Sequence, residues 1–224
     1  MKKTFEADFF LEKLSKAGLD MFAARCYFSA FVAAARSITL ALQAVMQDTN
    51  GFDEWYKEQQ ETLTEDEIAK FFVRTRNEIQ HVGLTPLNSG CCWHDDHGQL
   101  KVQYQFSKDF DQPAPGAPDI DVVSTCSYYL TSLIQVVYDC YREFGPTIDP
   151  DQYYTLENLR GLGLTIEDVE EELGLPRGWT FVESGTDQDR IEALRRSAPR
   201  TEIDTMFEKY LGKTRFLDDE DRDI

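Results

Sequence analysis

The stretch from Tyr27 to Met46 constrains the fold of this chain more than any other feature of the sequence. It is almost entirely apolar; the residues that interrupt it are Ser29, Arg36, Ser37, Thr39 and Gln43. An arginine in the centre of a membrane span is costly, so the stretch favours a buried helix over a transmembrane one. We therefore expect a helix over about residues 21–47 that is apolar nearly all round and lies at the centre of a helical bundle.

Four other segments before Thr147 carry helical signals. Thr64-Glu65-Asp66-Glu67 has the form of a capping box with Thr64 as the N-cap, and the helix that it starts is expected to end near Val82-Gly83. Gly145-Pro146 is expected to end the last of these helices, because proline disfavours the helical conformation of the residue before it. The expected helices cover about residues 6–17, 52–60, 64–82 and 120–144.

Alternating apolar and polar residues from Leu100 to Phe106 follow the turn sequence His94-Asp95-Asp96-His97-Gly98. With Cys91-Cys92-Trp93 before the turn, this pattern predicts a β-hairpin over about residues 90–107. From Thr147 the chain becomes more polar, and Thr165-Ile166-Glu167-Asp168 is a second helix-start signal. Shorter helices are expected near residues 165–173, 187–196 and 202–211.

The fold class that follows is all-α. We expect an up-and-down helical bundle over residues 1–146, with the hairpin as a small insertion, and a polar helical appendage over residues 147–224. The appendage ends in the acidic segment Asp218–Ile224, which is too charged to fold by itself. Residues 5–14 mix apolar and charged side chains, unlike a signal peptide, and the five cysteines suggest no disulfide scaffold. A cytoplasmic protein without a membrane partner is therefore expected.

The net charge of −18 argues against non-specific binding of nucleic acid, which requires a basic surface. The charge is uneven, however. Arginines gather in the helices at the centre of the bundle, at Arg25, Arg36, Arg74 and Arg76, whereas acidic residues crowd other stretches such as 167–172. If the protein acts on RNA, its cleft is expected to be locally positive, with the acidic stretches turned away from it or shielding it.

The segment Arg74-Thr75-Arg76-Asn77-Glu78-Ile79-Gln80-His81 combines groups that suit RNA cleavage. Histidine transfers protons near neutral pH, and arginine holds phosphate through paired hydrogen bonds. Asn77 and His81 are four residues apart and share one helix face, to which Arg74 also returns. Arg76 is about 140° away in helical projection, so its long side chain has to reach round or act from a partner subunit.

Arg76 and His81, with four residues between them and Asn77 directly after the arginine, resemble the R-x4-6-H signature of the HEPN superfamily. The segment Tyr27–Ile38 also resembles the second helix of such domains. Many members are metal-independent ribonucleases of toxin–antitoxin, phage-defence and RNA-processing systems, and most are homodimers in which two motifs meet in one cleft. Others have lost catalysis and serve as dimerisation or RNA-binding modules, so a shared fold does not settle activity.

The resemblance implies a metal-independent endoribonuclease of a toxin or defence system that needs no cofactor. Arg76, His81 and Asn77 would be catalytic in a dimeric cleft, and Arg74 and Arg36 would bind the substrate. The implied partners are a second copy of the chain, RNA, and an antitoxin or other protein. The alternative is a non-catalytic HEPN-like module for dimerisation or protein binding, and a third reading is an unrelated helical protein whose motif arose by chance.

Each motif residue also has a purely structural explanation. A histidine in the last turn of a helix hydrogen-bonds the free carbonyls and interacts favourably with the helix dipole. Arg76 is able to pair with Glu78 or another acidic neighbour. Arg36 is able to extend its charged end to solvent or to pair with a buried carboxylate such as Glu78. Both explanations stay open on the sequence alone.

Cys91, Cys92, His94 and His97 place four metal-binding side chains within seven residues. Their spacing matches no common zinc pattern, which requires Cys-x2-4-Cys or two separated pairs. No nucleotide-binding glycine motif or serine-hydrolase motif is present in the sequence. We therefore expect a polar hairpin turn without a metal.

Overall fold

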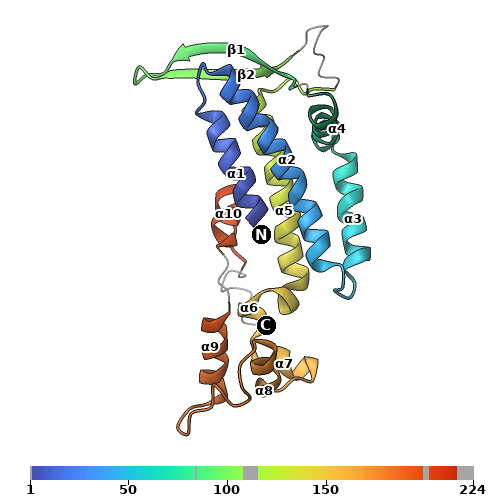
Figure 1. The fold of residues 1–224 in the computed structure, drawn as a ribbon, viewed down its shortest axis with the longest axis vertical. Coiled ribbons are helices and arrows are strands. Elements are labelled where there is room, and N and C mark those ends of the chain that lie inside the picture. The colour runs from blue at the N-terminus through green and yellow to red at the C-terminus, as the bar shows by residue number, and fades with distance from the viewer. Residues whose placement is uncertain (1, 84, 108–115, 199–201, 216–224) are drawn as a thin grey trace. The chain divides into compact units, whose positions relative to one another are not determined.

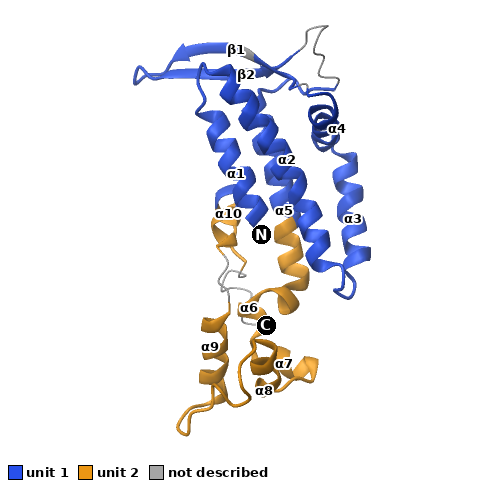
Figure 2. Ribbon diagram, in the orientation of Figure 1, with its two compact units in different colours: residues 1–136, 209–211 blue, residues 137–208, 212–224 orange. Residues whose placement is uncertain are grey.

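The structure is a computed structural model of the chain that describes residues 2–83, 85–107, 116–198 and 202–215 (Figure 1). Helices account for 67% and strands for 7% of these residues, which confirms that the fold is mainly α. The acidic segment Asp218–Ile224 lies outside the described residues. The contacts divide the chain into two compact units, coloured in Figure 2: unit 1 is 1–136 with 209–211, and unit 2 is 137–208 with 212–224.

Unit 1 consists of four helices, a hairpin and the first part of a fifth helix (Figure 1). The elements are α1 (Lys2–Ser15), α2 (Met21–Met46), α3 (Phe52–Glu65), α4 (Glu67–Val82), β1 (Leu87–His94), β2 (Leu100–Phe106) and α5 (Val122–Ile148). The predicted central helix is therefore confirmed within one residue at its end. Asp20 caps its N-terminus by accepting a hydrogen bond from the Ala23 N–H (2.9 Å).

Helix α2 is buried along most of its length, at Ala24, Phe28, Phe31, Val32, Ala34, Ala35, Ile38, Thr39, Leu42 and Met46. It packs against α1, α4 and β1. By length and composition it is the one helix of the described residues that is apolar enough to cross a membrane. A core helix of a bundle passes the same test, and the burial of α2 in unit 1 fits that explanation.

Stacked and edge-on aromatic rings join the elements of unit 1. The rings of Phe72 in α4 and Tyr129 in α5 are parallel within 7°, with centroids 4.4 Å apart. Phe72 also meets Phe31 of α2 at 5.9 Å, and Phe71 meets Phe106 of β2 edge-on at 4.8 Å. These rings are almost fully buried, so one aromatic cluster fixes α2, α4, α5 and the hairpin to each other.

The predicted hairpin is present and begins at Leu87. Its strands are antiparallel, with Cys92 opposite Val102, and a bulge lies between Ser89 and Cys91. Gly90 stands at the bulge, where a Cβ atom would lie 2.3 Å from the Gln103 carbonyl oxygen, so a larger residue would not fit. Figure 1 shows the hairpin across one end of α1 and α2.

Two contacts anchor the hairpin to α2 and to the turn that precedes it. The hydroxyl of the buried Tyr104 donates to the Gly18 carbonyl (2.6 Å), and Arg25 Nε donates to the Leu87 carbonyl (3.3 Å). Arg25 is therefore occupied with the base of the hairpin rather than with the motif of α4.

Two expected helix ends were wrong. Thr64 does not cap α4: it lies in the last turn of α3, where its hydroxyl donates to the Gln60 carbonyl, and Asp66 accepts the N–H groups of Ile68 (2.7 Å) and Ala69 (3.1 Å) instead. An aspartate two residues after the threonine offers the same cap with a charge that suits the helix dipole.

Gly145-Pro146 does not end α5, which continues to Ile148. Pro146 removes one N–H donor only, and the Asp149 N–H closes the next turn on the Gly145 carbonyl (2.9 Å). The boundary expected after residue 146 also differs from the division of contacts, which falls after Val136 inside α5. Since α5 is one continuous helix, no change in sequence pattern marks that point.

Unit 2 contains the rest of α5 and five short helices: α6 (Pro150–Tyr153), α7 (Leu156–Leu162), α8 (Ile166–Glu172), α9 (Asp187–Ser197) and α10 (Ile203–Leu211), the last shared with unit 1. The expected helices at 165–173, 187–196 and 202–211 are confirmed, and so is the Thr165 cap, which forms a full capping box with Asp168. A small core is built from Tyr154, Leu159, Ile166, Val169, Ile191, Leu194 and Ala198.

A buried carboxylate lies beside this core. Glu170 of α8 is fully buried and accepts the N–H (2.8 Å) and hydroxyl (2.6 Å) of Thr180 and the Gly178 N–H. Arg190 Nη2 of α9 donates to it as well (3.3 Å). Burial by itself raises the pKa of Glu170, but these hydrogen bonds outweigh burial and lower the pKa from 4.5 to about 2.

Replacing Phe72 by alanine is expected to destabilise unit 1 by about 3–5 kcal/mol, because it removes the Phe72–Tyr129 stack and leaves a cavity in the aromatic cluster. Urea unfolding followed by far-UV circular dichroism measures the change. Val73→Ala, at the neighbouring exposed position, is the matched control and should stay within about 0.5 kcal/mol of the wild type. Equal effects of the two substitutions would contradict this account of the core.

Glu170→Gln is expected to destabilise the fold by about 2 kcal/mol at neutral pH, because it removes a charged hydrogen-bond acceptor. A carboxyl whose pKa is lower in the folded than in the unfolded chain stabilises the fold above the unfolded pKa. The difference between wild type and Glu170→Gln should therefore be full above pH 4.5 and vanish as the pH falls toward about 2. A difference that does not depend on pH would contradict the assignment of the charge.

Candidate functional site

Helix α4 carries the Arg-Asn-x-x-x-His motif and turns one face to the core. Ala69, Phe71, Phe72 and Thr75 are buried, which leaves the opposite side of the helix to solvent. The exposed side presents Lys70, Arg74, Asn77 and His81, at spacings of four, three and four residues. Such spacings place side chains on one helix face. We call these four residues the α4 stripe.

His81 ends the α4 stripe in the last turn of the helix, where it is exposed. The helix is closed by Gly83 in the left-handed conformation (φ 75°), whose N–H donates to the Ile79 carbonyl (3.1 Å). In the described part of the chain the imidazole of His81 takes part in no hydrogen bond. The backbone thus supplies the cap, and the imidazole remains accessible.

Arg76 is half-buried, and its Nη1 donates to Asn77 Oδ1 (3.2 Å). Across the described residues it forms no ion pair, either with Glu78 or with another acidic neighbour. The structure therefore brings together Arg76 and Asn77 of the three predicted catalytic residues, and it shows no contact of Arg76 with His81 of the same chain.

A cavity of about 680 Å³ opens at the other end of the α4 stripe, between α2, α3, α4 and α5 of unit 1. Its volume lies in the range of about 300–1,000 Å³ that is usual for small-ligand sites. The residues that line it are Arg36, Thr39, Tyr56, Gln60, Leu63, Thr64, Glu67, Ala69, Lys70, Val73, Arg74, Tyr129 and Leu133. Both arginines that were predicted to bind substrate, Arg36 and Arg74, are among them.

Arg36 and Arg74 make this cavity locally positive. Arg36 is half-buried, and its Nη1 donates to Thr39 Oγ1 (3.1 Å). Lys70 pairs with Glu67 (2.6 Å), but neither arginine has a carboxylate at ion-pair distance within the described ranges, so the alternative pairing of Arg36 with Glu78 is not found. In a chain with 41 acidic and 23 basic residues, two arginines without carboxylate partners at one cavity indicate a site for an anion.

Gly116, just before α5, packs on the guanidinium of Arg74. A Cβ atom at this position would lie 2.4 Å from Arg74 Nη2, and the backbone of Gly116 is in the left-handed region (φ 70°). The left-handed backbone favours glycine here, whereas the flexible end of Arg74 would have to move to admit a larger residue. The close approach limits the directions that the Arg74 side chain is able to take.

Two tyrosine hydroxyls complete the polar part of the cavity. Burial raises the pKa of Tyr56, while Thr39, the charge of Arg36 and Gln60 lower it to a smaller extent. Burial also raises the pKa of Tyr129 to about 12. Both phenols are therefore neutral at physiological pH and act as hydrogen-bond donors, not as bases. Tyr56 and Gln60 carry no sequence signal that points to this cavity.

The turn of the hairpin lacks a metal-site geometry. Cys91, Cys92, His94 and His97 are all exposed, and Cys91 Sγ donates to Gln103 Oε1 (3.1 Å). Asp95 accepts the N–H groups of His97 and Gln99 and so shapes the turn. Over the described ranges no three histidine, cysteine or carboxylate side chains gather closely enough to hold a metal ion.

Chelation is therefore expected to leave the protein unchanged. Dialysis against EDTA should not shift the thermal unfolding midpoint, and added Zn²⁺ should not stabilise the wild type relative to a Cys91→Ser/Cys92→Ser variant. Differential scanning fluorimetry measures both effects. Stabilisation by Zn²⁺ that is lost in the double variant would show that the turn binds metal after all.

A family model described as "Bacteriophage lambda protein ea47" matches residues 20–91. The matched segment covers α2, α3, α4 and the start of the hairpin, and so includes Arg36, the α4 stripe and Arg76. No curated protein and no solved structure shows significant similarity to the chain. In this segment the chain is thus similar to a family named after a phage protein.

Proposed function

We propose that unit 1 is a metal-independent endoribonuclease of HEPN type that binds single-stranded RNA along the α4 stripe. One observation carries the proposal: Arg74 belongs at once to the anion-binding cavity, where Arg36 faces the same space, and to the helix face that ends in the accessible His81. Arg74, which lines the cavity, and the accessible His81 therefore lie on the same helix.

The chemistry requires little of the protein, because RNA carries its own nucleophile in the ribose 2′-hydroxyl. Cleavage needs a proton acceptor, a donor for the leaving oxygen and positive charge at the phosphate. His81 is the proton acceptor, and Arg76, oriented by Asn77, supplies charge at the scissile phosphate. Arg74 and His81 are seven residues apart, about 10 Å along the helix, so they serve different nucleotides of one strand.

A single chain offers one such histidine, whereas the reaction uses both an acid and a base. The proposal therefore includes a two-fold homodimer, in which the same surface of each copy meets and two motifs form one cleft. It also places the protein in the cytoplasm. It keeps the toxin or phage-defence role that the motif resemblance implies, with an antitoxin as the expected protein partner.

The second candidate is a non-catalytic RNA- or protein-binding module. It is favoured by the single observation that Arg76 is hydrogen-bonded to Asn77 and makes no contact with His81 in the same chain. In that case the cavity would still bind phosphate, and RNA would be bound but not cut.

His81→Ala is expected to reduce cleavage of single-stranded RNA by about a hundred- to ten-thousand-fold in the presence of EDTA, since it removes the proton acceptor. His97→Ala, an exposed histidine of the hairpin turn, is the matched control and should leave the rate unchanged.

Arg36→Gln and Arg74→Gln should weaken RNA binding. Each should also reduce the slope of the logarithm of the binding constant against the logarithm of the salt concentration by about 0.7 in magnitude, because one phosphate contact is lost. The exposed Arg142 of α5 lies outside the cavity, and Arg142→Gln serves as their control.

Mixing the wild type with an excess of His81→Ala tests the dimeric cleft. If the reaction needs His81 from both copies, mixed dimers are inactive and the activity per wild-type chain falls, whereas independent sites would keep the activity per wild-type chain unchanged. RNA binding that depends on Arg36 and Arg74 without any cleavage by the wild type would reject the enzyme in favour of the binding module. Wild-type activity in His81→Ala would reject the assignment of His81.

A further inference from the structure

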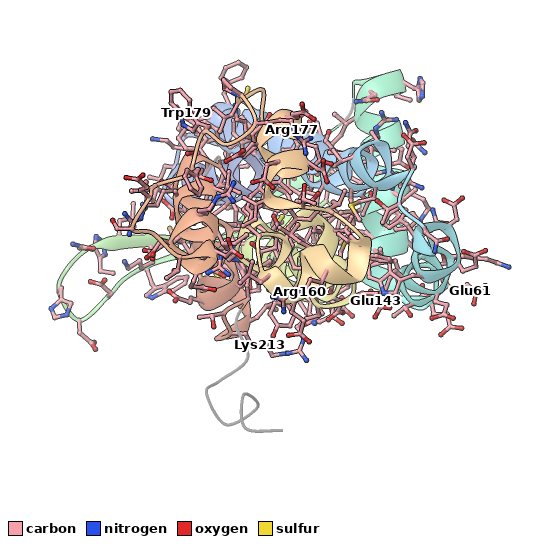
Figure 3. All side chains as sticks on the ribbon, turned by 90° about the horizontal axis from the view of Figure 1, so that it is seen from below. Glu61, Glu143, Arg160, Arg177, Trp179 and Lys213 are labelled. Atoms are coloured by element: carbon pink, nitrogen blue, oxygen red, sulfur yellow. The ribbon has the colours of Figure 1, made fainter. Side chains whose placement is uncertain are left out.

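The connection between α8 and α9 in unit 2 exposes three large apolar side chains. Trp179 and Phe181 are each 65% exposed and Val182 is 60% exposed, although a core of the same unit lies next to them in sequence. Trp179 is labelled among the side chains in Figure 3. We call residues 178–182 the Trp179 loop. An apolar surface of this kind, bordered by charged residues, is typical of an interaction site.

A buried ionic network fixes the Trp179 loop. Thr180, at its centre, donates through its N–H (2.8 Å) and its hydroxyl (2.6 Å) to the buried Glu170, which also accepts the Gly178 N–H. Arg190 connects the same groups: its Nε donates to Thr180 Oγ1 (3.0 Å) and its Nη2 to Glu170 (3.3 Å) and Glu167 (2.6 Å). The inward-facing Thr180 thus alternates with the outward-facing Trp179 and Phe181.

The backbone restricts the loop further. The Phe181 N–H donates to the Gly178 carbonyl (3.0 Å), and Gly178 has a φ of 80°, which favours glycine. A buried ion pair adds little net stability compared with apolar residues of the same size, but it orders the groups around it. A loop that is ordered before binding loses less conformational entropy when a partner binds. The network therefore keeps the exposed rings in one arrangement.

The border of the Trp179 loop is acidic. Arg177 is neutralised by Asp168 and Glu171, each 2.9 Å from its Nη1. Glu183 at the end of the loop and Asp187 at the start of α9 are exposed. The charged residues named around the rings are thus mostly acidic, in a chain whose net charge is −18.

We infer that the Trp179 loop is a docking site for a protein partner that offers an apolar helix face bordered by lysines or arginines. Charge complementarity selects this occupant. A second copy would bring the same acidic border against itself in a two-fold contact, and RNA or an anionic membrane would be repelled. The inference is independent of the ribonuclease proposal, because it rests on unit 2 alone and is tested without RNA.

The test uses the full-length protein and a fluorescently labelled synthetic amphipathic helix with leucines on one face and lysines on the other. Fluorescence anisotropy should show binding that weakens as salt is added, and the same peptide with glutamates in place of lysines should bind at least about tenfold more weakly. Trp179→Ala and Phe181→Ala should each lower the affinity about tenfold or more, as expected for aromatic anchors. Phe22→Ala, an exposed phenylalanine of α2 in unit 1, is the matched control and should have no effect.

Thr180→Val tests whether the order of the Trp179 loop contributes to binding independently of its apolar side chains. It removes the hydroxyl between Glu170 and Arg190 but keeps Trp179 and Phe181, so weaker binding with an unchanged far-UV spectrum would support a preordered site. The inference is overturned if the lysine peptide does not bind, if Trp179→Ala binds it like the wild type, or if the glutamate peptide binds equally well. Comparable binding to vesicles of anionic phospholipid, or self-association that Trp179→Ala abolishes, would also overturn it in favour of a membrane or of a second copy.

Discussion

The stack of Phe72 on Tyr129 is the contact on which the arrangement of unit 1 depends. It joins α4 to α5, and neighbouring rings extend the cluster to α2 and to β2. A helix that buries Phe71, Phe72 and Thr75 on one side has no freedom to rotate about its axis. The core therefore decides that Arg74 and His81 face solvent together, and the candidate site is a consequence of packing as much as of its own residues.

Electrostatics distinguishes the cavity from the rest of the chain. In unit 2, Arg177 and Arg190 are paired with carboxylates. Arg36 and Arg74 instead have no carboxylate at ion-pair distance among the described residues, and Glu67, the one carboxylate among the residues that line their cavity, pairs with Lys70. Because burial keeps the phenols of Tyr56 and Tyr129 protonated, the wall offers donors to an anion and no competing negative charge from these groups. A locally positive site is thereby compatible with a net charge of −18.

Unit 2 uses charge in another way. Glu170 and Arg190 are nearly inaccessible to solvent, and removing either partner would leave the other buried and unpaired. Such pairs specify a conformation more than they stabilise a fold, which suits a loop that has to hold exposed rings in place. Arg215 likewise fixes the conformation at the end of the described chain, because its Nε donates to Asp204 (2.8 Å).

The sequence by itself determined the elements whose signals are local. The apolar run placed α2, alternation placed the hairpin, and the Thr165 box placed α8, because periodicity and capping act over a few residues. Thr64 and Asp66 are both suitable N-cap residues, so the sequence pattern did not decide which of them starts α4. Helix α6 has four residues, which is too short for a helical periodicity to be recognised. Only the tertiary structure joined Arg36, Tyr56, Arg74 and Tyr129, which come from four helices, into one cavity. It alone showed that Glu170, within an acidic stretch, is buried: burial depends on which distant donors come near, and no local pattern encodes that.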